Sequence, residues 1–348
     1  MHFYGITLEN VGPFRGVQNV EFDYGESGRA NVVCGGGGSG MTFFVKAMEW
    51  ALAGEDENAA HFYSRQWRHQ NDETLFDGNA CVTLRLELCG RDYEIARRRI
   101  GGDETPLRDV LNLRRRTTGK EGWEPIDNPE LAIRAMIPSE IRRALFFSDY
   151  DDIFEASERT SLSVLSIPEF RSWVSRKLGV TRIAACTNAD VRVFDFLRAK
   201  LAGETVNYAS GIRCFSGMQL FALLREWFIV SDSLPSNLRH LRGEVLPWVM
   251  DNPFGVLDLA LRAGAAKLLV ESAAQIVMVA RSLQLDEPMR STLAHVLGRL
   301  YLIRTGEVGL GGADVDLFGH NLHLSREDGA HFSEIVPIRG CAGIRNRS

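Results

Sequence analysis

The sequence lacks any apolar run long enough to cross a membrane as a helix. Its two most apolar windows, 219–231 and 265–280, are both interrupted by charged residues, whereas a membrane helix needs roughly 20 mainly apolar residues. The first residues also lack the basic stretch followed by an apolar stretch that marks a secretory signal. We therefore expect a cytoplasmic protein that makes no contact with membranes.

Paired cysteines and a strong net charge are missing as well. The six cysteines are scattered, and no CxxC pair or Cys/His cluster indicates a zinc site, so we expect reduced thiols. The histidines show no metal-ligand spacing, and this includes His320 and His323 near the end of the chain. A net charge of -5 gives no general attraction to nucleic acid, so DNA contact requires a local basic patch.

What the sequence does contain is an alternation of strand and helix patterns along its 348 residues. Strands are predicted at 3–9, 17–23, 30–34, 80–88, 93–100, 245–251, 275–280 and 299–304, with a further pair within 108–126. Helices are predicted at 42–52, 217–230, 257–273 and 287–298, and a further helix within 129–147. Early hairpins followed by alternating strands and helices predict an α/β fold, with a mostly parallel core sheet and an antiparallel β side lobe.

A glycine-rich stretch joins the strand at 30–34 to the helix at 42–52. Residues 35–42 read GGGGSGMT and keep both framing glycines and the threonine of the phosphate-loop motif GxxxxGK[ST]. Such glycines let backbone N–H groups turn inward around an anion, and the positive end of the next helix adds to the attraction. The same composition is also typical of a flexible linker, although a linker needs neither the strand nor the helix.

The phosphate-loop interpretation assigns a role to individual residues. The candidate phosphate-binding residues are Gly35, Gly38, Ser39, Gly40, Met41 and Thr42. The hydroxyl of Thr42 is the candidate magnesium ligand within the loop.

Met41 occupies the position of the motif lysine. A charge-assisted hydrogen bond contributes roughly 1.5–3 kcal/mol, so its loss weakens triphosphate binding by about ten- to a hundred-fold or more. Hydrolysis suffers further, because the lysine also stabilises charge on the transferred phosphoryl group. Lys46 is no obvious substitute, since five residues place it about 140° around the helix and more than a turn away.

An acid ends one of the buried strands in the second half of the chain. The apolar strand at 245–251 (VLPWVMD) finishes in Asp251, and in P-loop enzymes such an acid orients magnesium. A buried strand that ends in an aspartate is common, so this feature alone is not specific. The next residue is Asn252, an amide that cannot act as a general base.

Several segments, in the same order along the chain, resemble the nucleotide-binding heads of ABC-type ATPases of the SMC, SbcC, RecF and DndD group. The opening GITLENVGPFRG resembles their first hairpin, and ALFFSD at 144–149 resembles a segment near their Q-loop. FSGMQ at 215–219 lies at the position of their signature motif, and NPFGVLD at 252–258 resembles the segment after their Walker B strand.

This resemblance implies a P-loop NTPase fold that binds ATP and Mg²⁺, with Thr42 and Asp251 at the metal. Ser216 and Gly217 would cap the γ-phosphate of a nucleotide held by a second head, and Asp258 would lie in the D-loop at the same interface. Asp251 and Asn252 are then the candidate catalytic positions.

The sequence also departs from the pattern of these heads. The lysine is replaced by Met41 and the catalytic glutamate by Asn252, and no switch histidine follows the strand at 275–280. These losses predict weak hydrolysis or none, so the chain is an ATPase only if residual or partner-supplied groups suffice. The long coiled coil is missing too, since the insertion has about 50 residues and contains Pro168.

The resemblance divides the chain into four parts. We expect an N-terminal lobe at 1–150 with the phosphate loop and the β side lobe, and a short helical insertion at 151–205. A C-terminal lobe at 206–305 carries the signature motif, Walker B and the D-loop. The remainder, 306–348, is expected to be a peripheral tail, either a hairpin or partly disordered.

Two arginine runs, 97–99 and 114–116, fall on predicted side-lobe strands. Alternation along a strand would place Arg97 and Arg99 on one face and Arg98 on the other. The runs are consistent with a DNA-contacting face or with a solvated hairpin that carries surface arginines.

Two functional hypotheses remain open. In the first, the chain is a DNA-associated ATP-binding head subunit in DNA repair, DNA modification or phage defence. Such a head would pair as a homodimer or heterodimer and gate DNA or a nuclease or helicase partner, with weak or partner-dependent hydrolysis. In the second, it is a pseudo-ATPase scaffold that dimerises or docks a partner without using nucleotide.

Overall fold

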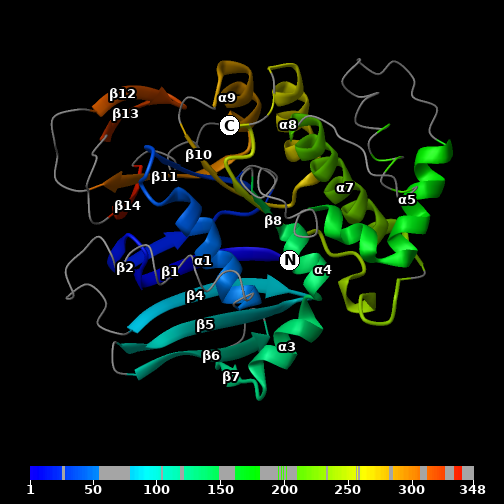
Figure 1. The fold of residues 1–348 in the computed structure, drawn as a ribbon, viewed down its shortest axis with the longest axis horizontal. Coiled ribbons are helices and arrows are strands. Elements are labelled where there is room, and N and C mark those ends of the chain that lie inside the picture. The colour runs from blue at the N-terminus through cyan, green and yellow to red at the C-terminus, as the bar shows by residue number, and fades with distance from the viewer. Residues whose placement is uncertain are drawn as a thin grey trace.

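One large mixed sheet organises the computed structural model of the chain (Figure 1). Its twelve strands lie in the order β7-β6-β5-β4-β1-β2-β14-β11-β3-β10-β9-β8. The structure describes residues 1–25, 28–54, 79–102, 105–117, 121–148, 161–180, 195, 197, 199, 201, 210–232, 234–255, 257, 259–281, 285–305, 312–325 and 333–338.

The antiparallel side lobe is built from the early strands, as the sequence predicted. Its members are β1 (His2–Val11), β2 (Phe14–Glu21), β4 (Asn79–Leu88), β5 (Arg91–Gly102), β6 (Thr105–Thr117) and β7 (Glu124–Pro125). Apolar side chains alternate along these strands, so that Ile6, Leu84 and Ile95 are fully buried on the inner face. The opposite face carries mainly polar side chains.

The parallel core also matches the prediction. It consists of β3 (Ala30–Gly35), β8 (Phe146–Ser148), β9 (Trp248–Asp251), β10 (Ile276–Ala280) and β11 (Leu297–Thr305). β3 pairs in parallel with both β10 and β11, and β9 pairs in parallel with β10 and β8. Every residue of β3, β9 and β10 is buried, as expected for parallel strands covered on both faces.

The segment expected as a peripheral tail contributes to two sheets. β12 (Gly312–Leu317) and β13 (His320–Ser325) form a separate antiparallel hairpin. β14 (Ser333–Pro337), in contrast, lies inside the main sheet, antiparallel to β11 and parallel to β2. This strand therefore joins the side lobe to the parallel core.

Helix α1 (Met41–Ala53) packs against both halves of the sheet. It contacts β3, β9 and β10 of the core and β1, β4 and β5 of the side lobe. Its buried side chains include Phe44, Met48 and Leu52, which follow the i, i+4 spacing of a single helix face. This helix fixes how the residues before its first turn sit at the sheet edge.

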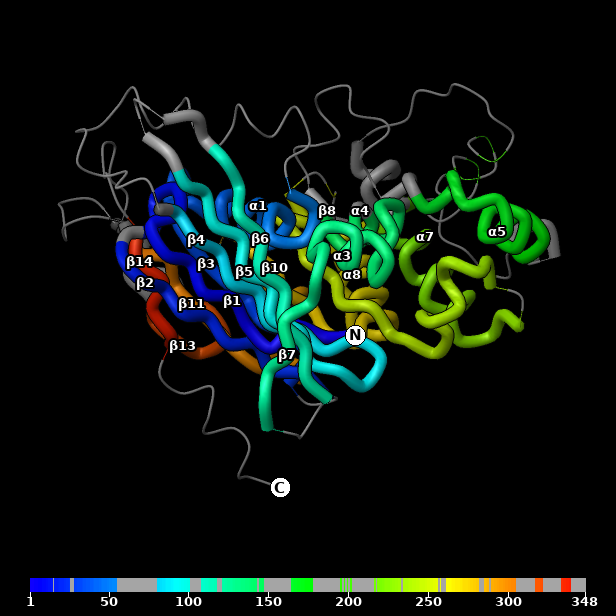
Figure 2. Tube along the Cα trace, turned by 90° about the horizontal axis from the view of Figure 1, so that it is seen from below, coloured from blue at the N-terminus to red at the C-terminus, as the bar shows by residue number. Residues whose placement is uncertain are grey.

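The remaining helices cover the other parts of the core. α7 (Ser210–Val230), α8 (Leu259–Ser272) and α9 (Glu287–Ala294) contact one another in chain order. η3 (Ser161–Ser166) and α5 (Pro168–Val180) lie against α7, and Figures 1 and 2 place α5 at the end of the molecule opposite β2 and β14. No helix in the described ranges is both long enough and apolar enough to span a membrane.

Three predicted helices differ clearly from the structure. The helix predicted at 287–298 ends at Ala294, and residues 297–298 belong to strand β11. The range 129–147, expected to contain one helix, holds two short helices, α3 (Pro129–Met136) and α4 (Ser139–Leu145), and the first residues of strand β8. Pro138 explains the break, because Ile137 before it is extended and a proline disfavours helical backbone at the preceding residue. The predicted helix at 217–230 begins seven residues earlier, at Ser210.

Candidate functional site

The glycine-rich stretch forms the connection between β3 and α1. β3 ends at Gly35, α1 begins at Met41, and the amide of Ser39 donates to the carbonyl of Gly36 at 3.3 Å in the turn between them. Because β3 is flanked by β10 and β11 and α1 packs on the same sheet, both ends of the turn are fixed. The stretch is therefore a structured loop at the carboxyl end of the core, as the phosphate-loop interpretation requires.

Little space is left for a side chain at either of the two framing glycines of this loop. A Cβ on Gly35 would lie 2.3 Å from Ser39 Oγ, and a Cβ on Gly40 would lie 2.5 Å from Pro13 Cγ. Gly40 also has a φ of +96°, which other residues rarely adopt. Gly37 and Gly38 instead face open space, because a Cβ on either would meet nothing within 4 Å.

Polar groups of the loop and of the first turn of α1 are open to an anion. Gly40 is the N-cap of α1, with no side-chain cap and no acid in the first turn among the described residues. The first N–H groups of a helix lack intrahelical partners and carry partial positive charge. Ser39 Oγ is buried and has no hydrogen-bond partner within the described part of the chain. These groups fit phosphate oxygens as partners.

Neither Met41 nor Lys46 takes the place of the lysine that binds phosphate in the motif. Met41 is partly buried against the hydrophobic core, and its Cγ lies 3.2 Å from the position of a Cβ on Gly35. Lys46 pairs with Glu49 further along α1, with 3.1 Å between Nζ and Oε2. The loop therefore has an apolar side chain at its base where the motif places a cation.

Asp251 lies at the carboxyl end of the parallel strands, as the loop does. It ends β9 with 2% of its surface exposed, and the register aligns it with Val279 of β10, which in turn aligns with Val33 of β3. One strand thus separates β3 from β9, which corresponds to about 10 Å between their backbones. The register therefore places Asp251 at the carboxyl end of the core, where the loop before Thr42 also lies, and a cation between Thr42 and Asp251 stays a prediction.

The described residues contain no group of three or more His, Cys, Asp or Glu that could hold a metal. A cation between Thr42 and Asp251 would therefore need further oxygen ligands from a bound phosphate or from water. This donor set is compatible with Mg²⁺, which usually keeps several waters and binds through one or two carboxylates and substrate phosphates.

The backbone at Asn252 makes a sharp turn directly after β9. Asn252 has a φ of +53°, its amide donates to the carbonyl of Val279 at 2.9 Å, and its carbonyl accepts from the amide of Gly255 at 3.1 Å. Asparagine tolerates left-handed backbone better than most residues. The amide side chain at this position thus fits the turn but offers no general base.

The signature-like residues do not lie at a helix start. Ser216 and Gly217 are inside α7, and Ser216 is fully buried, because the helix begins at Ser210. In this conformation the hydroxyl of Ser216 is not presented at the molecular surface. Asp258 of the predicted D-loop lies outside the described residues, as does Asp149 of the segment at 144–149.

The arginine runs are largely offset by acids. Alternation holds as predicted, since Arg97 and Arg99 face the protein whereas Arg98 is exposed. The ion pairs are Arg97–Glu130 at 2.7 Å, Arg99–Asp109 at 3.0 Å, Arg116–Asp92 at 2.8 Å, Arg115–Glu124 at 3.4 Å, and Arg114–Glu94. The side lobe therefore offers much less free positive charge than its arginine content suggests.

Sequence reasoning missed the role of the first hairpin turn in shaping the loop. Pro13 contacts Gly40, and its carbonyl accepts from the amide of Ser333 in β14 at 2.6 Å. Contacts between residues so distant in sequence leave no local pattern, so only the folded chain reveals them.

Comparison with known proteins gives a fold but no close relative. No protein-family model and no curated protein matches the sequence. An SMC head domain from Thermotoga maritima aligns over 98% of this chain and 100% of its own, at 13% identity and a TM-score of 0.46. A crystal structure of the SmcHead bound to the C-winged helix domain of ScpA aligns over 97% of this chain and 98% of its own, at 13% identity and a TM-score of 0.54.

The loop, the mixed sheet and the helix after the loop make up a P-loop fold. More specifically, the chain has the fold of an SMC-like head domain along nearly its whole length. This confirms the fold that the ordered motifs predicted.

Proposed function

We propose that this chain is a nucleotide-binding head subunit that holds ATP and Mg²⁺ weakly and works in pairs. The observation that carries the proposal is the loop between β3 and α1, which is fixed at both ends and open in its middle. Its uncapped helix start and the buried hydroxyl of Ser39 supply groups that suit a polyphosphate.

Each candidate residue has a distinct part in this proposal. The backbone N–H groups at Gly38, Ser39 and Gly40 would bind the phosphates, and Thr42 and Asp251 would hold the Mg²⁺ that neutralises phosphate charge. Binding is weakened because Met41 supplies no cation. Hydrolysis is slow because Asn252 cannot take a proton from the attacking water, so turnover depends on a partner that lends the missing groups.

The paired arrangement follows from the resemblance to SMC-like heads. Gly35 to Thr42 of one head would face Ser216 and Gly217 of a second head, either a copy of this chain or a different subunit. Since Ser216 is buried inside α7, the first turns of that helix would have to rearrange when the heads meet. Asp258 would lie at the same interface.

The partners of the head pair and the process in which it acts are proposed from the same resemblance to SMC-like heads. The state of the head pair would gate DNA or a nuclease or helicase partner, in DNA repair, DNA modification or phage defence. The solved SmcHead is bound to a winged-helix domain of ScpA, which supports the idea that such a fold docks a second protein. The ion-paired arginines of the side lobe favour a partner-assisted DNA contact over a direct one.

A second candidate function is a pseudo-ATPase scaffold that keeps the fold for docking and uses no nucleotide. The packing of Met41 against the core and the burial of Ser216 favour it. The retained Gly40, Thr42 and Asp251 oppose it, because a scaffold has no need for them.

Calorimetric titration of Mg²⁺–ATP into the full chain separates the two candidates. The nucleotide proposal expects measurable binding to the wild-type chain, and about ten-fold or tighter binding after Met41→Lys, since a charge-assisted hydrogen bond is restored. The matched control is Lys46→Met, which exchanges the same two residue types on the same helix and leaves the affinity unchanged.

If neither the wild-type chain nor Met41→Lys gives heat at millimolar ATP, the nucleotide-binding proposal is excluded and only the pseudo-ATPase scaffold remains. A loss of binding in Lys46→Met would contradict the assignment of Met41 to the lysine position.

A further inference from the structure

Among the residues that the structure describes, the outer edge of β6 is only partly covered, by β7 and by the neighbouring helix α3. Within the described residues, the strand paired with this edge is β7, which covers only Arg114 and Arg115. The carbonyl of Leu113 also faces outward, since it accepts from the amide of Ile126 at 2.9 Å. Because backbone groups alternate along a strand, Asp109 and Leu111 present their N–H and C=O groups to the same open edge.

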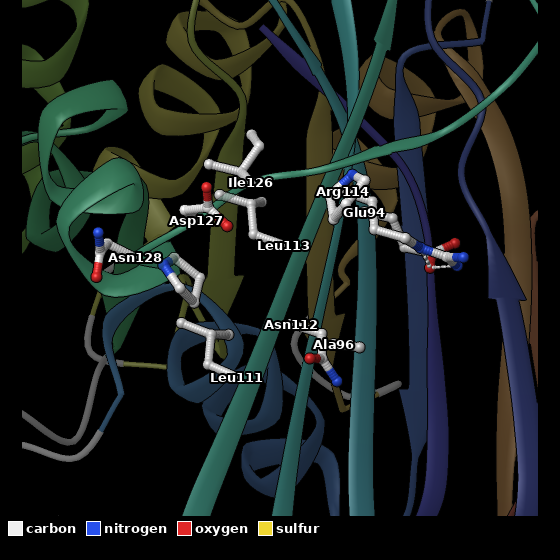
Figure 3. Close-up of a pocket in the computed structure, with 11 residues that line it drawn as sticks. Glu94, Ala96, Leu111, Asn112, Leu113, Arg114, Ile126, Asp127 and Asn128 are labelled. Carbon is white, nitrogen blue, oxygen red and sulfur yellow. Dashed lines mark hydrogen bonds and ion pairs between the residues drawn. The ribbon is translucent and has the colours of Figure 1, made fainter.

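A pocket of about 460 Å³ lies where the chain after β7 leaves this edge. Figure 3 shows Leu111 and Leu113 on the same side of β6 as Ile126 and Asp127, whereas Asn112 lies on the other side. The lining thus combines apolar side chains with two amides, two carboxylates and one guanidinium group. Its volume is sufficient for one or two side chains of an added strand, but small for a folded domain.

The negative charge in the pocket lining favours a ligand with a basic side chain. Glu94 in the lining is paired with Arg114, whereas the exposed Asp127 makes no ion pair with any described residue. The lining therefore carries one uncompensated negative charge. This charge repels nucleic acid and attracts a lysine or arginine side chain.

We propose that the open edge of β6 binds an extended peptide segment of a partner protein. The segment adds as a strand beside Asp109 and Leu111, places an apolar side chain against Leu111 and Ile126, and places a basic side chain next to Asp127. Main-chain hydrogen bonds supply affinity in this mode of binding, and the pocket for alternate side chains supplies specificity. The proposal does not depend on nucleotide binding.

A library of random nonapeptides displayed on phage, selected on the full chain, tests this proposal. Enriched peptides are then synthesised with a fluorescent label, and their affinity is measured by anisotropy. We expect a lysine or arginine in the enriched peptides and about ten-fold weaker binding to Asp127→Asn. The control Glu121→Gln removes an exposed acid outside the pocket lining and leaves the affinity unchanged.

Two further measurements separate strand addition from a simple charge contact. A peptide methylated on alternate backbone nitrogens cannot donate to β6 and should lose binding, while the same methylation on the other nitrogens should be tolerated. Bound peptide should also slow hydrogen exchange at the amides of Asp109 and Leu111. The proposal would be overturned by no enrichment over the empty display vector, by binding that survives both methylation patterns, or by binding that is unchanged in Asp127→Asn.

Discussion

Two buried side-chain amides form hydrogen bonds that hold the segment before β3 against the neighbouring strands. Asn31 and Gln275 are both fully buried and both hydrogen-bond the backbone of Asp23. Gln275 also accepts from the amide of Phe3 at 2.7 Å and donates to its carbonyl at 2.8 Å. Buried backbone groups need such partners, so these two side chains determine how the segment before β3 packs.

Replacing Gln275 with leucine should destabilise the chain by about 2–4 kcal/mol, because buried backbone groups of Phe3 and Asp23 lose their partners. Urea unfolding followed by circular dichroism measures the change. Gln18→Leu is the graded control, since Gln18 is half-buried and accepts a hydrogen bond from the amide of Ile335 in β14; its cost should be about 1 kcal/mol. Equal costs for the two variants would contradict this account of Gln275.

Burial of His2 makes stability depend on pH. Burial lowers the pKa of His2 below its ordinary 6.5, an effect larger than the opposing attraction of Glu87, whose Oε2 lies 3.2 Å from Nδ1. The unfolded chain then binds a proton at His2 more readily than the folded chain does, so the free energy of unfolding falls as the pH drops through 6.5.

Replacement of His2 with glutamine should remove that part of the pH dependence. Chemical unfolding of the wild-type chain and of His2→Gln at several pH values between about 5 and 8 measures it, in the range where histidine titrates. We expect a smaller decrease in stability below pH 6.5 for the variant. The same or a steeper decrease would show that protonation of His2 is not disfavoured by folding.

At the scale of elements, the loop between β3 and α1 depends on two glycines for different reasons. Gly40 needs both its positive φ and the absence of a side chain, since Pro13 lies against it. Gly38 has a φ of +78° but open space around it. The loop is therefore rigid at the helix start and unobstructed where a ligand would enter.

This difference predicts unequal costs for two alanine substitutions. Gly38→Ala should cost about 1–2 kcal/mol from backbone strain alone. Gly40→Ala should cost about 2–4 kcal/mol, because overpacking against Pro13 adds to the strain. Thermal unfolding of the two variants provides the measurement, and a Gly40→Ala variant as stable as Gly38→Ala would contradict the contact with Pro13.

The sequence predicted these elements where the pattern is local and failed where distant contacts decide. The strands of the side lobe, the loop and α1 follow from alternation, glycine spacing and helical periodicity. Strand β8 was hidden in a range predicted to contain a helix because its three residues pair with β9, about 100 positions away in the chain. The early start of α7 was missed too, and with it the burial of Ser216.

The same limit applies to the candidate site. The places of Gly35 at the end of a strand, Gly40 at the start of a helix and Asp251 at the end of a second strand could be predicted from local sequence patterns. Their roles at a nucleotide stay predictions. The contact of Pro13 with Gly40 could not be predicted, since it joins separate elements. Likewise, the arginine runs gave no sign of their acidic partners, which lie on neighbouring strands and on α3.

At the scale of the whole molecule, the sheet connects a solvated antiparallel lobe to a buried parallel core. α1 packs on both parts, and β14 links them within the sheet. The open edge of β6 lies at the far side of the side lobe, at the opposite end of the strand order from β9 and β8. A peptide at that edge and a nucleotide at the loop could therefore be held at the same time.

A crystal structure of the chain grown with Mg²⁺ and a non-hydrolysable ATP analogue tests the central claim most directly. The account predicts the triphosphate inside the turn at Gly36 to Gly40, with Mg²⁺ near Thr42 on the side of Asp251, and the Met41 side chain still against Gly35. Phosphate density elsewhere on the molecule, or an empty loop in crystals grown at millimolar analogue, would contradict it.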